Sequence, residues 1–269
     1  MLKATPHTPR ILVLDSGIGG LSVVKEIRNL LPFVYIRYFA DLEAFPYGTK
    51  SQGEVVARVT SIVSQQLRIE AFDVVVLACN TASTAALEEL RSQHDVPFVG
   101  VVPAIKPAAQ LSQKKRITVL ATDATISREY TRRLIEEFAK DCHVNLHASP
   151  KLVQFAEQKL MGGVSLEAIE NEVSLIFKDE SSSPDTVVLA CTHFPILKPE
   201  LERVKPHVQW VDSGYAIAKR VKFWIEKLDL IHLEDLHQKN LFVHSKTPAY
   251  SYSHEAVKEY LGEFEHYEL

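Results

Sequence analysis

Two cysteines that follow similar apolar runs are the residues of this chain best suited to chemistry. Cys79 lies in VVVLACNTAS at residues 74–83, and Cys191 lies in VVLACTHFPI at residues 187–196. The thiolate is the reactive form of cysteine, and a helix N-terminus lowers the thiol pKa. A single cysteine at a strand end is usually a packing residue, and we assign that role to Cys142. Two cysteines followed by hydroxyl, amide or imidazole groups instead predict a functional pair.

Other reactive side chains also follow apolar runs. Asp15 and Ser16 come after RILVL at 10–14, and Thr122 and Thr125 come after ITVLA at 117–121. His193 stands two residues after Cys191, which favours a role in proton transfer. Ligands of open parallel sheets bind at the carboxyl ends of the strands, and helix N-termini attract anions. These residues therefore predict a site for a small anion.

A pair of thiols on opposite sides of such an anion indicates acid–base chemistry. A lone nucleophilic cysteine requires a base and an oxyanion hole, and the phosphatase pattern Cys-x5-Arg is absent after both cysteines. The chain also has no Cys-x-x-Cys pair, which disfavours zinc and redox sites. One thiolate can remove a proton from carbon while the other thiol delivers one to the opposite face. This scheme inverts a stereocentre without a cofactor.

Apolar periodicity predicts strands that alternate with helices along most of the chain. The predicted strands are 10–14, 34–39, 74–78, 99–101, 117–121, 144–147, 186–190, 208–211 and 241–244. The predicted helices are 21–31, 51–67, 81–91, 104–111, 126–139, 151–160, 165–178, 217–228 and 254–261. Such alternation with all-apolar strands predicts an α/β fold of parallel sheets. One sheet of about eight strands is possible, but two smaller sheets suit the two similar cysteine-terminated strands better.

Composition excludes several other classes of protein. The 269 residues carry a net charge of −4 and no strongly basic stripe, so no nucleic-acid partner is expected. No apolar stretch approaches the ~20 residues of a membrane span, and the N-terminus lacks the apolar segment of a signal peptide. We therefore expect a cytoplasmic protein with reduced cysteines and no membrane partner.

Seven motifs in order resemble the bacterial glutamate racemases of the aspartate/glutamate racemase superfamily. They lie between about residue 10 and residue 222: DSGIGG at 15–20, PYGTK at 46–50, ACNTAS at 78–83, GVVPA at 100–104, ATDAT at 121–125, CTHFP at 191–195 and VDSG at 211–214. The last forty residues match only loosely. The resemblance implies two similar parallel-sheet α/β domains with the active site in the cleft between them. We expect residues 1–99 and 212–269 to form the first domain and residues 100–211 the second.

The resemblance also implies roles for individual residues. Cys79, assisted by Asp15, would act on D-glutamate, and Cys191, assisted by His193, would act on L-glutamate. The substrate would be held by a set of mostly small polar residues: Asp15, Ser16, Tyr47, Gly48, Asn80, Thr81, Thr122, Thr125, Thr192 and His193. Glu157 matches a further acidic position near the pocket, for which a solvated helix glutamate is the competing interpretation. Asp212 more simply caps the helix that follows it.

The implied activity is racemisation of glutamate for peptidoglycan synthesis, without pyridoxal phosphate or any other cofactor or metal, by an enzyme that is often a homodimer. One alternative is an aspartate racemase of the same superfamily, because the depth of the pocket cannot be read from sequence. Another alternative is a non-catalytic amino-acid-binding or regulatory protein, since some members of the family also inhibit DNA gyrase. The intact cysteine pair speaks against the non-catalytic alternative.

Overall fold

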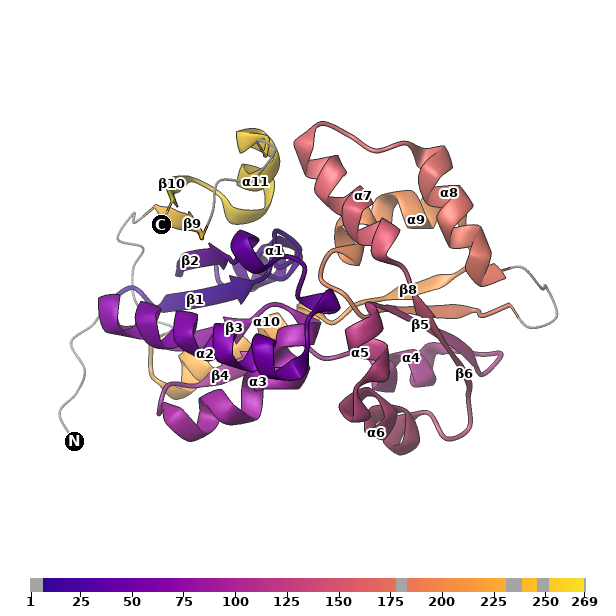
Figure 1. Ribbon diagram of the computed structural model, residues 1–269, viewed down its shortest axis with the longest axis horizontal. Helices are drawn as coiled ribbons and strands as arrows, with labels where there is room; N and C mark the ends of the chain where they lie inside the picture. The colour runs from indigo at the N-terminus through magenta and orange to yellow at the C-terminus, as the bar shows by residue number, and fades with distance from the viewer. Residues whose placement is uncertain (1–6, 178–182, 231–238, 246–251, 269) are drawn as a thin grey trace.

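Two separate parallel β-sheets form the framework of the molecule (Figure 1). The computed structural model describes residues 7–177, 183–230, 239–245 and 252–268. Within them, one sheet has the strand order β10-β9-β2-β1-β3-β4 and the other the order β6-β5-β7-β8. Every neighbouring pair of strands is parallel. The prediction of two parallel-sheet α/β domains is therefore confirmed, and the alternative of one large sheet is wrong.

The larger sheet takes its strands from both ends of the chain. They are β1 (Arg10–Asp15), β2 (Tyr35–Ala40), β3 (Val74–Leu77), β4 (Phe98–Gly100), β9 (Asn240–His244) and β10 (Phe264–Glu268). Three helices pack on one face: α1 (Leu21–Leu30), α10 (Gly214–Lys227) and α11 (His254–Leu261). The other face is covered by α2 (Gln52–Ile69) and α3 (Asn80–Gln93).

The smaller sheet is built from the middle of the chain. Its strands are β5 (Arg116–Ala121), β6 (His143–Ala148), β7 (Thr186–Leu189) and β8 (Gln209–Val211). One face packs against α4 (Ile105–Leu111) and α6 (Glu129–Phe138), and the other against α7 (Pro150–Met161), α8 (Leu166–Ser174) and α9 (Lys198–Val204). Shorter pieces complete the described chain: α5 (Asp123–Ser127) and the 3₁₀ turns η1 (Leu42–Ala44), η2 (Tyr47–Thr49), η3 (Leu175–Phe177) and η4 (Phe194–Leu197).

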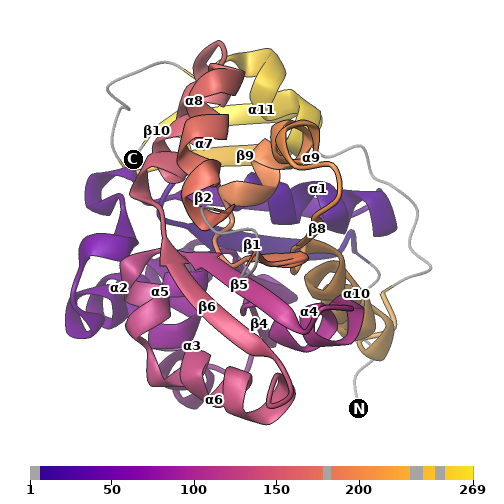
Figure 2. The same cartoon turned by 90° about the vertical axis from the view of Figure 1, so that its right-hand side faces the viewer.

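Sheet membership changes twice along the chain. The chain passes from the first sheet to the second between Gly100 and Arg116, and it returns to the first sheet between Val211 and Asn240. The view from the side of the second domain shows α10 lying behind that domain, against the first (Figure 2). The more exact division into 1–99 with 212–269 and 100–211 stays a prediction.

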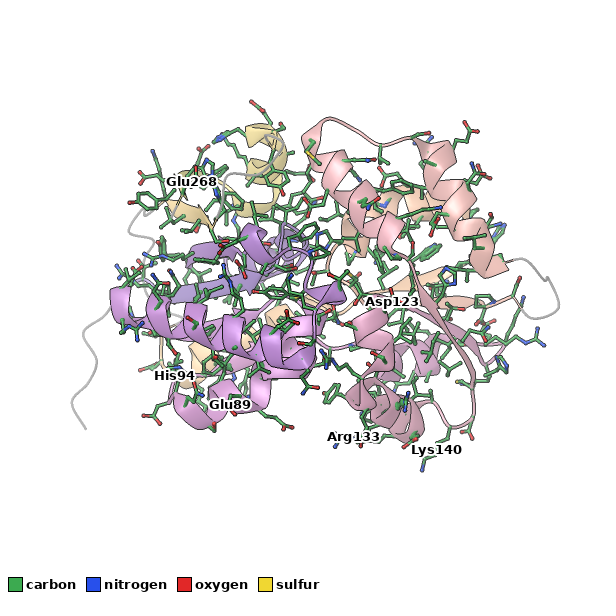
Figure 3. All side chains as sticks on the ribbon, viewed as in Figure 1. Glu89, His94, Asp123, Arg133, Lys140 and Glu268 are labelled. Atoms are coloured by element: carbon green, nitrogen blue, oxygen red, sulfur yellow. The ribbon has the colours of Figure 1, made fainter. Side chains whose placement is uncertain are left out.

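The core explains why the strand sequences are apolar throughout. Ile11 and Val13 point to one face of β1, whereas Leu12 and Leu14 point to the other, and all four are fully buried. One apolar cluster runs from α1, α10 and α11 on the first sheet to α7, α8 and α9 on the second. We call it the shared core, because it packs the two domains against each other. Charged side chains such as Glu89, Arg133 and Lys140 lie on the outer surface (Figure 3).

Local signals in the sequence account for several helix ends. The capping box at Ser51 is confirmed, since the Ser51 hydroxyl accepts a hydrogen bond from the N–H of Glu54 and the Glu54 carboxylate accepts one from the N–H of Ser51. The predicted single helix 126–139 is wrong, because Arg128 is extended (φ −68°, ψ 135°) and separates α5 from α6. At this break the Thr131 hydroxyl donates to the Thr125 carbonyl at 2.6 Å, which satisfies a carbonyl that the helix no longer uses.

Candidate active site

A pocket lies between the two sheets, at the carboxyl ends of their strands. All of the predicted site residues except Glu157 line it: Asp15, Ser16, Tyr47, Gly48, Cys79, Asn80, Thr81, Thr122, Thr125, Cys191, Thr192 and His193. Its empty volume is about 340 Å³, open solvent included, which is at the small end for ligand sites. One alanine separates Cys79 from the end of β3 in the first sheet, and one alanine separates Cys191 from the end of β7 in the second. The pocket therefore brings both thiols together from different domains.

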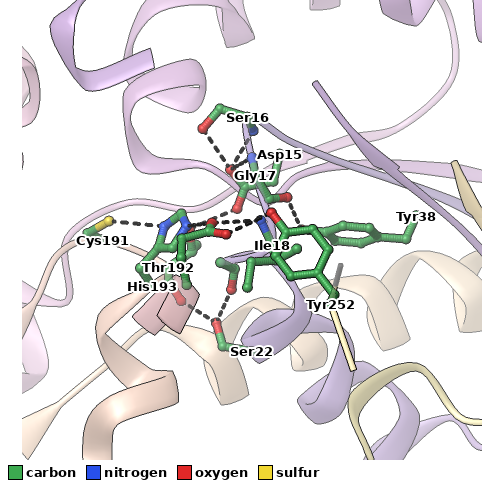
Figure 4. Close-up of polar contacts among 12 residues, drawn as sticks. Asp15, Ser16, Gly17, Ile18, Ser22, Tyr38, Cys191, Thr192, His193 and Tyr252 are labelled. Atoms are coloured by element: carbon green, nitrogen blue, oxygen red, sulfur yellow. Dashed lines mark hydrogen bonds and ion pairs between the residues drawn. The ribbon is translucent and has the colours of Figure 1, made fainter. Parts of the chain in front are cut away.

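Cys191 belongs to a buried chain of polar contacts. Its Sγ lies 3.7 Å from Nδ1 of His193, and Nε2 of His193 donates to Oε1 of Glu157 at 2.7 Å (Figure 4). Burial alone lowers the pKa of His193, but the hydrogen bonds with Cys191 and Glu157 outweigh it and raise that pKa well above the usual value. This is the arrangement of a thiol, a base and an orienting carboxylate. It favours an imidazolium beside the Cys191 sulfur.

Glu157 is a buried partner of His193 and not a solvated helix residue. Only 7% of it is exposed, although it lies on α7. Its Oε1 also accepts a weak hydrogen bond, at 3.4 Å, from the N–H of Ile18, and its Oε2 accepts one from the Tyr252 hydroxyl at 2.7 Å. The competing interpretation of a solvated glutamate is therefore wrong. Glu157 therefore orients His193, which lines the pocket, without lining the pocket itself.

The glycines of the DSGIGG turn let the second domain approach the first. A Cβ added at Gly19 would lie 2.4 Å from Nδ1 of His193, and one added at Gly17 would lie 2.9 Å from Oε1 of Glu157. Real Cβ atoms do not come so close, so a side chain at either place would displace the His193–Glu157 pair. The turn thus needs glycine for close packing across the domains and not for phosphate binding.

A Gly19→Ala variant is expected to lose about 10- to 100-fold in kcat/KM, because the new methyl group pushes the His193 ring away from Cys191. Steady-state kinetic assays would measure the loss, and thermal unfolding would show a destabilisation of about 1–3 kcal/mol. The matched control is Gly53→Ala in α2, where a Cβ meets no atom within 4 Å. Equal activities of the two variants would contradict the proposed packing of His193.

Asp15 is a fully buried carboxylate at the end of β1. Its Oδ2 accepts a hydrogen bond from the Thr192 hydroxyl at 3.0 Å, and its Oδ1 accepts the N–H of Ser16 at 2.5 Å. Burial raises the pKa of Asp15, and the nearby His193 charge and these hydrogen bonds only partly offset that effect. Because Thr192 belongs to the second domain, the Asp15–Thr192 contact also crosses the pocket. Asp15 is thus placed to exchange a proton within the site.

Cys79 is the N-cap residue of α3. Burial and the charge of Asp15 raise the pKa of Cys79 well above its ordinary value, and the N–H groups of Ala82 and Thr81 only partly counteract them. The expectation that a helix N-terminus lowers this thiol pKa is therefore wrong for Cys79. Cys191 also contributes to raising it, which indicates that the two sulfurs interact across the pocket. Cys79 is thus held as a neutral thiol.

Hydroxyls and amides complete the wall of the pocket. The Thr81 hydroxyl lies 3.2 Å from that of Thr122 and 3.3 Å from that of Thr125, so the starts of α3 and α5 meet across the domains. The side-chain nitrogen of Asn80 is buried and has no hydrogen-bond partner among the described residues. An unpartnered buried donor is costly unless a ligand satisfies it. Asn80 therefore points to an anionic or carbonyl-bearing ligand.

Tyr47 is held from outside the pocket. Its hydroxyl donates to Asp41 at 2.7 Å, and Arg58 of α2 binds the same carboxylate through Nε at 2.8 Å and Nη2 at 2.7 Å. Asp41 is itself fully buried, and its guanidinium partner leaves its pKa lowered despite burial. This cluster fixes the turn that carries Tyr47 and Gly48.

Some residues of the site were not predicted from the sequence. Phe45, Pro46 and Val153 also line the pocket, and Tyr252 contacts Glu157. Pro46 lies within the PYGTK motif, but no motif or periodic pattern marks Val153 or Tyr252 as site residues. Asp212 accepts the N–H of Gly214 at 2.9 Å, at the start of α10 and outside the pocket, as a capping role requires. Among the described residues, no group of three or more His, Cys, Asp or Glu side chains is arranged to hold a metal ion.

Comparisons with known proteins agree on one family. The family model described as Asp/Glu/hydantoin racemase matches residues 11–221. The glutamate racemase of Pectobacterium atrosepticum is 50% identical over 229 residues, which cover 83% of this chain and 79% of that protein. That of Escherichia coli strain K12 is 48% identical over 229 residues, covering 84% and 80%. A crystal structure of E. coli glutamate racemase with L-glutamate and the activator UDP-MurNAc-Ala superposes with a TM-score of 0.87 at 41% identity, covering 97% of this chain and 98% of that one.

Proposed function

Because the chain belongs to the Asp/Glu/hydantoin racemase family, we propose that it interconverts L- and D-glutamate with two cysteine thiols and without a cofactor. The observation that carries the proposal is the pairing of Cys79 and Cys191 in one pocket, each from a different domain and each with its own carboxylate or imidazole partner. The relatives that bear the name glutamate racemase, and one that was solved with L-glutamate, support the choice of substrate.

The proposed reaction starts with L-glutamate between the two sulfurs. The Cys191 thiolate takes the α-proton, so the C–H bond breaks, an S–H bond forms and a carbanion remains. The Cys79 thiol then gives its proton to the opposite face of the carbanion, which yields D-glutamate and a Cys79 thiolate. D-glutamate reacts by the same steps in reverse. Afterwards, protons move through His193 on one side and Asp15 on the other to restore the starting state.

The protonation states of the pocket residues suit the reaction that starts from L-glutamate. The neutral Cys79 thiol is ready to donate a proton, and the His193 imidazolium lies beside the Cys191 sulfur, with its Nδ1 3.7 Å away. For the reverse reaction the substrate ammonium offsets the repulsion that Asp15 exerts on a Cys79 thiolate. No Lys or Arg is among the described residues that line the pocket, so the substrate carboxylates would be bound by N–H groups, hydroxyls and Asn80. Closure of the domains on the substrate would exclude water and strengthen these fixed dipoles.

The direct test is circular dichroism of L-glutamate and, separately, D-glutamate with the purified chain and no added cofactor. Both signals are expected to decay to zero at the racemic mixture. Chiral chromatography with aspartate in place of glutamate tests the alternative of an aspartate racemase. In deuterium oxide, a non-catalytic amino-acid-binding protein would leave the α-carbon unlabelled, whereas a racemase introduces deuterium there.

We further propose that the chain acts in the cytoplasm as a homodimer and that its D-glutamate serves peptidoglycan synthesis. These points rest on the family resemblance and on the relatives. Among the described residues no helix has both the length and the apolar character needed to cross a membrane. Size-exclusion chromatography with light scattering would give the mass, and depletion of the protein in its host would be expected to make growth depend on added D-glutamate.

A further inference from the structure

One side chain from the C-terminal part of the chain contacts Glu157 behind the pocket, although no motif marked it. Tyr252 lies two residues before α11, and its hydroxyl donates to Oε2 of Glu157 at 2.7 Å. The other oxygen of Glu157 accepts from Nε2 of His193, whose Nδ1 faces Cys191. Figure 4 shows Cys191, His193 and Tyr252 in one row. We call these four residues, Cys191, His193, Glu157 and Tyr252, the Cys191 network.

A neighbouring backbone contact ties the segment that carries Tyr252 to α7. The N–H of the next residue, Ser253, donates to the carbonyl of Leu160 at 3.0 Å, and residues 157 and 160 lie on the same face of α7. Ser253 also caps α11 through its hydroxyl and the N–H of Ala256. The segment before α11 is therefore bound to the helix that carries Glu157. This geometry leaves the Tyr252 hydroxyl little freedom to point elsewhere.

In its contact with Glu157, the Tyr252 hydroxyl always acts as the hydrogen-bond donor. Burial and the charge of Glu157 raise the pKa of Tyr252, so its hydroxyl keeps its proton at all pH values at which the protein works. A donor on Oε2 fixes the rotation of the Glu157 carboxylate and leaves Oε1 directed at His193. The carboxylate in turn fixes the ring of His193, because one ring nitrogen is held by Oε1 while the other faces the thiol.

Resting on the proposed function, we propose that Tyr252 is a positioning residue for the Cys191 side of the reaction. It acts through Glu157 and His193 and has no contact of its own with the pocket. Cys79 has no member of the Cys191 network among its hydrogen-bond partners. The effect of losing the Tyr252 hydroxyl should therefore be larger at Cys191 than at Cys79.

The first test measures thiol reactivity and needs no turnover. Iodoacetamide alkylation at neutral pH, followed by peptide mass spectrometry, gives separate rates for Cys79, Cys142 and Cys191. In Tyr252→Phe, the rate at Cys191 is expected to fall about three- to tenfold, while the rate at Cys142 stays constant and the rate at Cys79 changes much less. The matched control is Tyr260→Phe, which removes a hydroxyl from α11 outside the network and should change none of the rates. An unchanged Cys191, or faster alkylation of both pocket thiols as in a loosened fold, would overturn the proposal.

The second test uses turnover. Because L- and D-glutamate have equal free energies, kcat/KM must fall equally in both directions, by about three- to tenfold in Tyr252→Phe. The α-deuterium isotope effect should rise with L-glutamate, whose proton Cys191 removes, and should decrease with D-glutamate. A merely structural defect would move both isotope effects alike. In a Glu157→Gln background, Tyr252→Phe should have almost no further effect, and a full additive loss would contradict action through Glu157.

These results also separate the two proposals. If the unmodified chain does not racemise glutamate but Tyr252→Phe still slows alkylation of Cys191 more than that of Cys79, the proposed function fails and the positioning role stands. If glutamate is racemised and the variant shows neither the selective alkylation change nor the opposed isotope effects, the positioning role fails and the function stands.

Discussion

Replacement of either Cys79 or Cys191 by serine is expected to abolish racemisation of glutamate in both directions. A serine hydroxyl is far too weak an acid to supply an anionic base at neutral pH, so kcat/KM should fall by at least about 10³-fold in each variant. Both side chains are less than a tenth exposed and the change is nearly isosteric, so the fold should be retained. Circular dichroism of each glutamate enantiomer would measure the loss.

The two variants should differ in what they still do. In deuterium oxide, Cys79→Ser retains Cys191 and should label only L-glutamate, slowly and without inversion. Cys191→Ser should label only D-glutamate. Cys142→Ser is the matched control, because Cys142 lies outside the pocket, and it should behave like the unchanged protein. Near-normal racemisation by either pocket variant would refute the two-base scheme.

Asp15→Asn is expected to lower kcat/KM by about 10²- to 10³-fold and, at the same time, to stabilise the protein at neutral pH. The loss of activity follows because an amide cannot exchange a proton with Cys79. The gain in stability follows because the folded chain holds the Asp15 pKa above its ordinary value of 3.8, mainly through burial. A carboxyl of this kind contributes stability that is fully present below its unfolded pKa and is lost as pH rises through its folded pKa.

The difference in melting temperature between Asp15→Asn and the unchanged chain should therefore grow as pH rises from 4 to neutrality. A gain of about 1 kcal/mol corresponds to roughly 2–4 °C in a chain of this size. The matched control is the exposed Asp141, whose replacement by asparagine should leave both activity and melting temperature unchanged. A difference that shrinks as pH rises would show that the fold prefers the ionised Asp15.

Most of the site was predictable because its residues stand next to strong strand signals. Mostly apolar runs mark β1 and β3 of the first sheet and β5 and β7 of the second, and within each parallel sheet the carboxyl ends of the strands lie along one edge. Residues at the ends of these strands or just beyond them, such as Asp15 and Cys191, were therefore placed by chain geometry alone. Assignment of the substrate required the resemblance, since hydroxyls and N–H groups bind many small anions.

Other features depend on contacts between distant parts of the chain. The pKa of Cys79 is set mainly by burial and by Asp15. Neither effect can be read from the residues that predict the helix after Cys79. Tyr252 reaches Glu157 across 95 positions, and its surroundings carry no periodic pattern. Strand β10 was missed because its sequence, FEHYE, is mostly exposed at the edge of the sheet and lacks an apolar run.

The shared core determines how the protein unfolds. Since one apolar cluster covers a face of each sheet, separating the two domains completely would expose part of this cluster to water. Neither half is then a self-sufficient folding unit, and heating should melt both in one cooperative calorimetric transition. To admit the substrate, the two domains must therefore open by a small rocking motion that leaves the shared core buried.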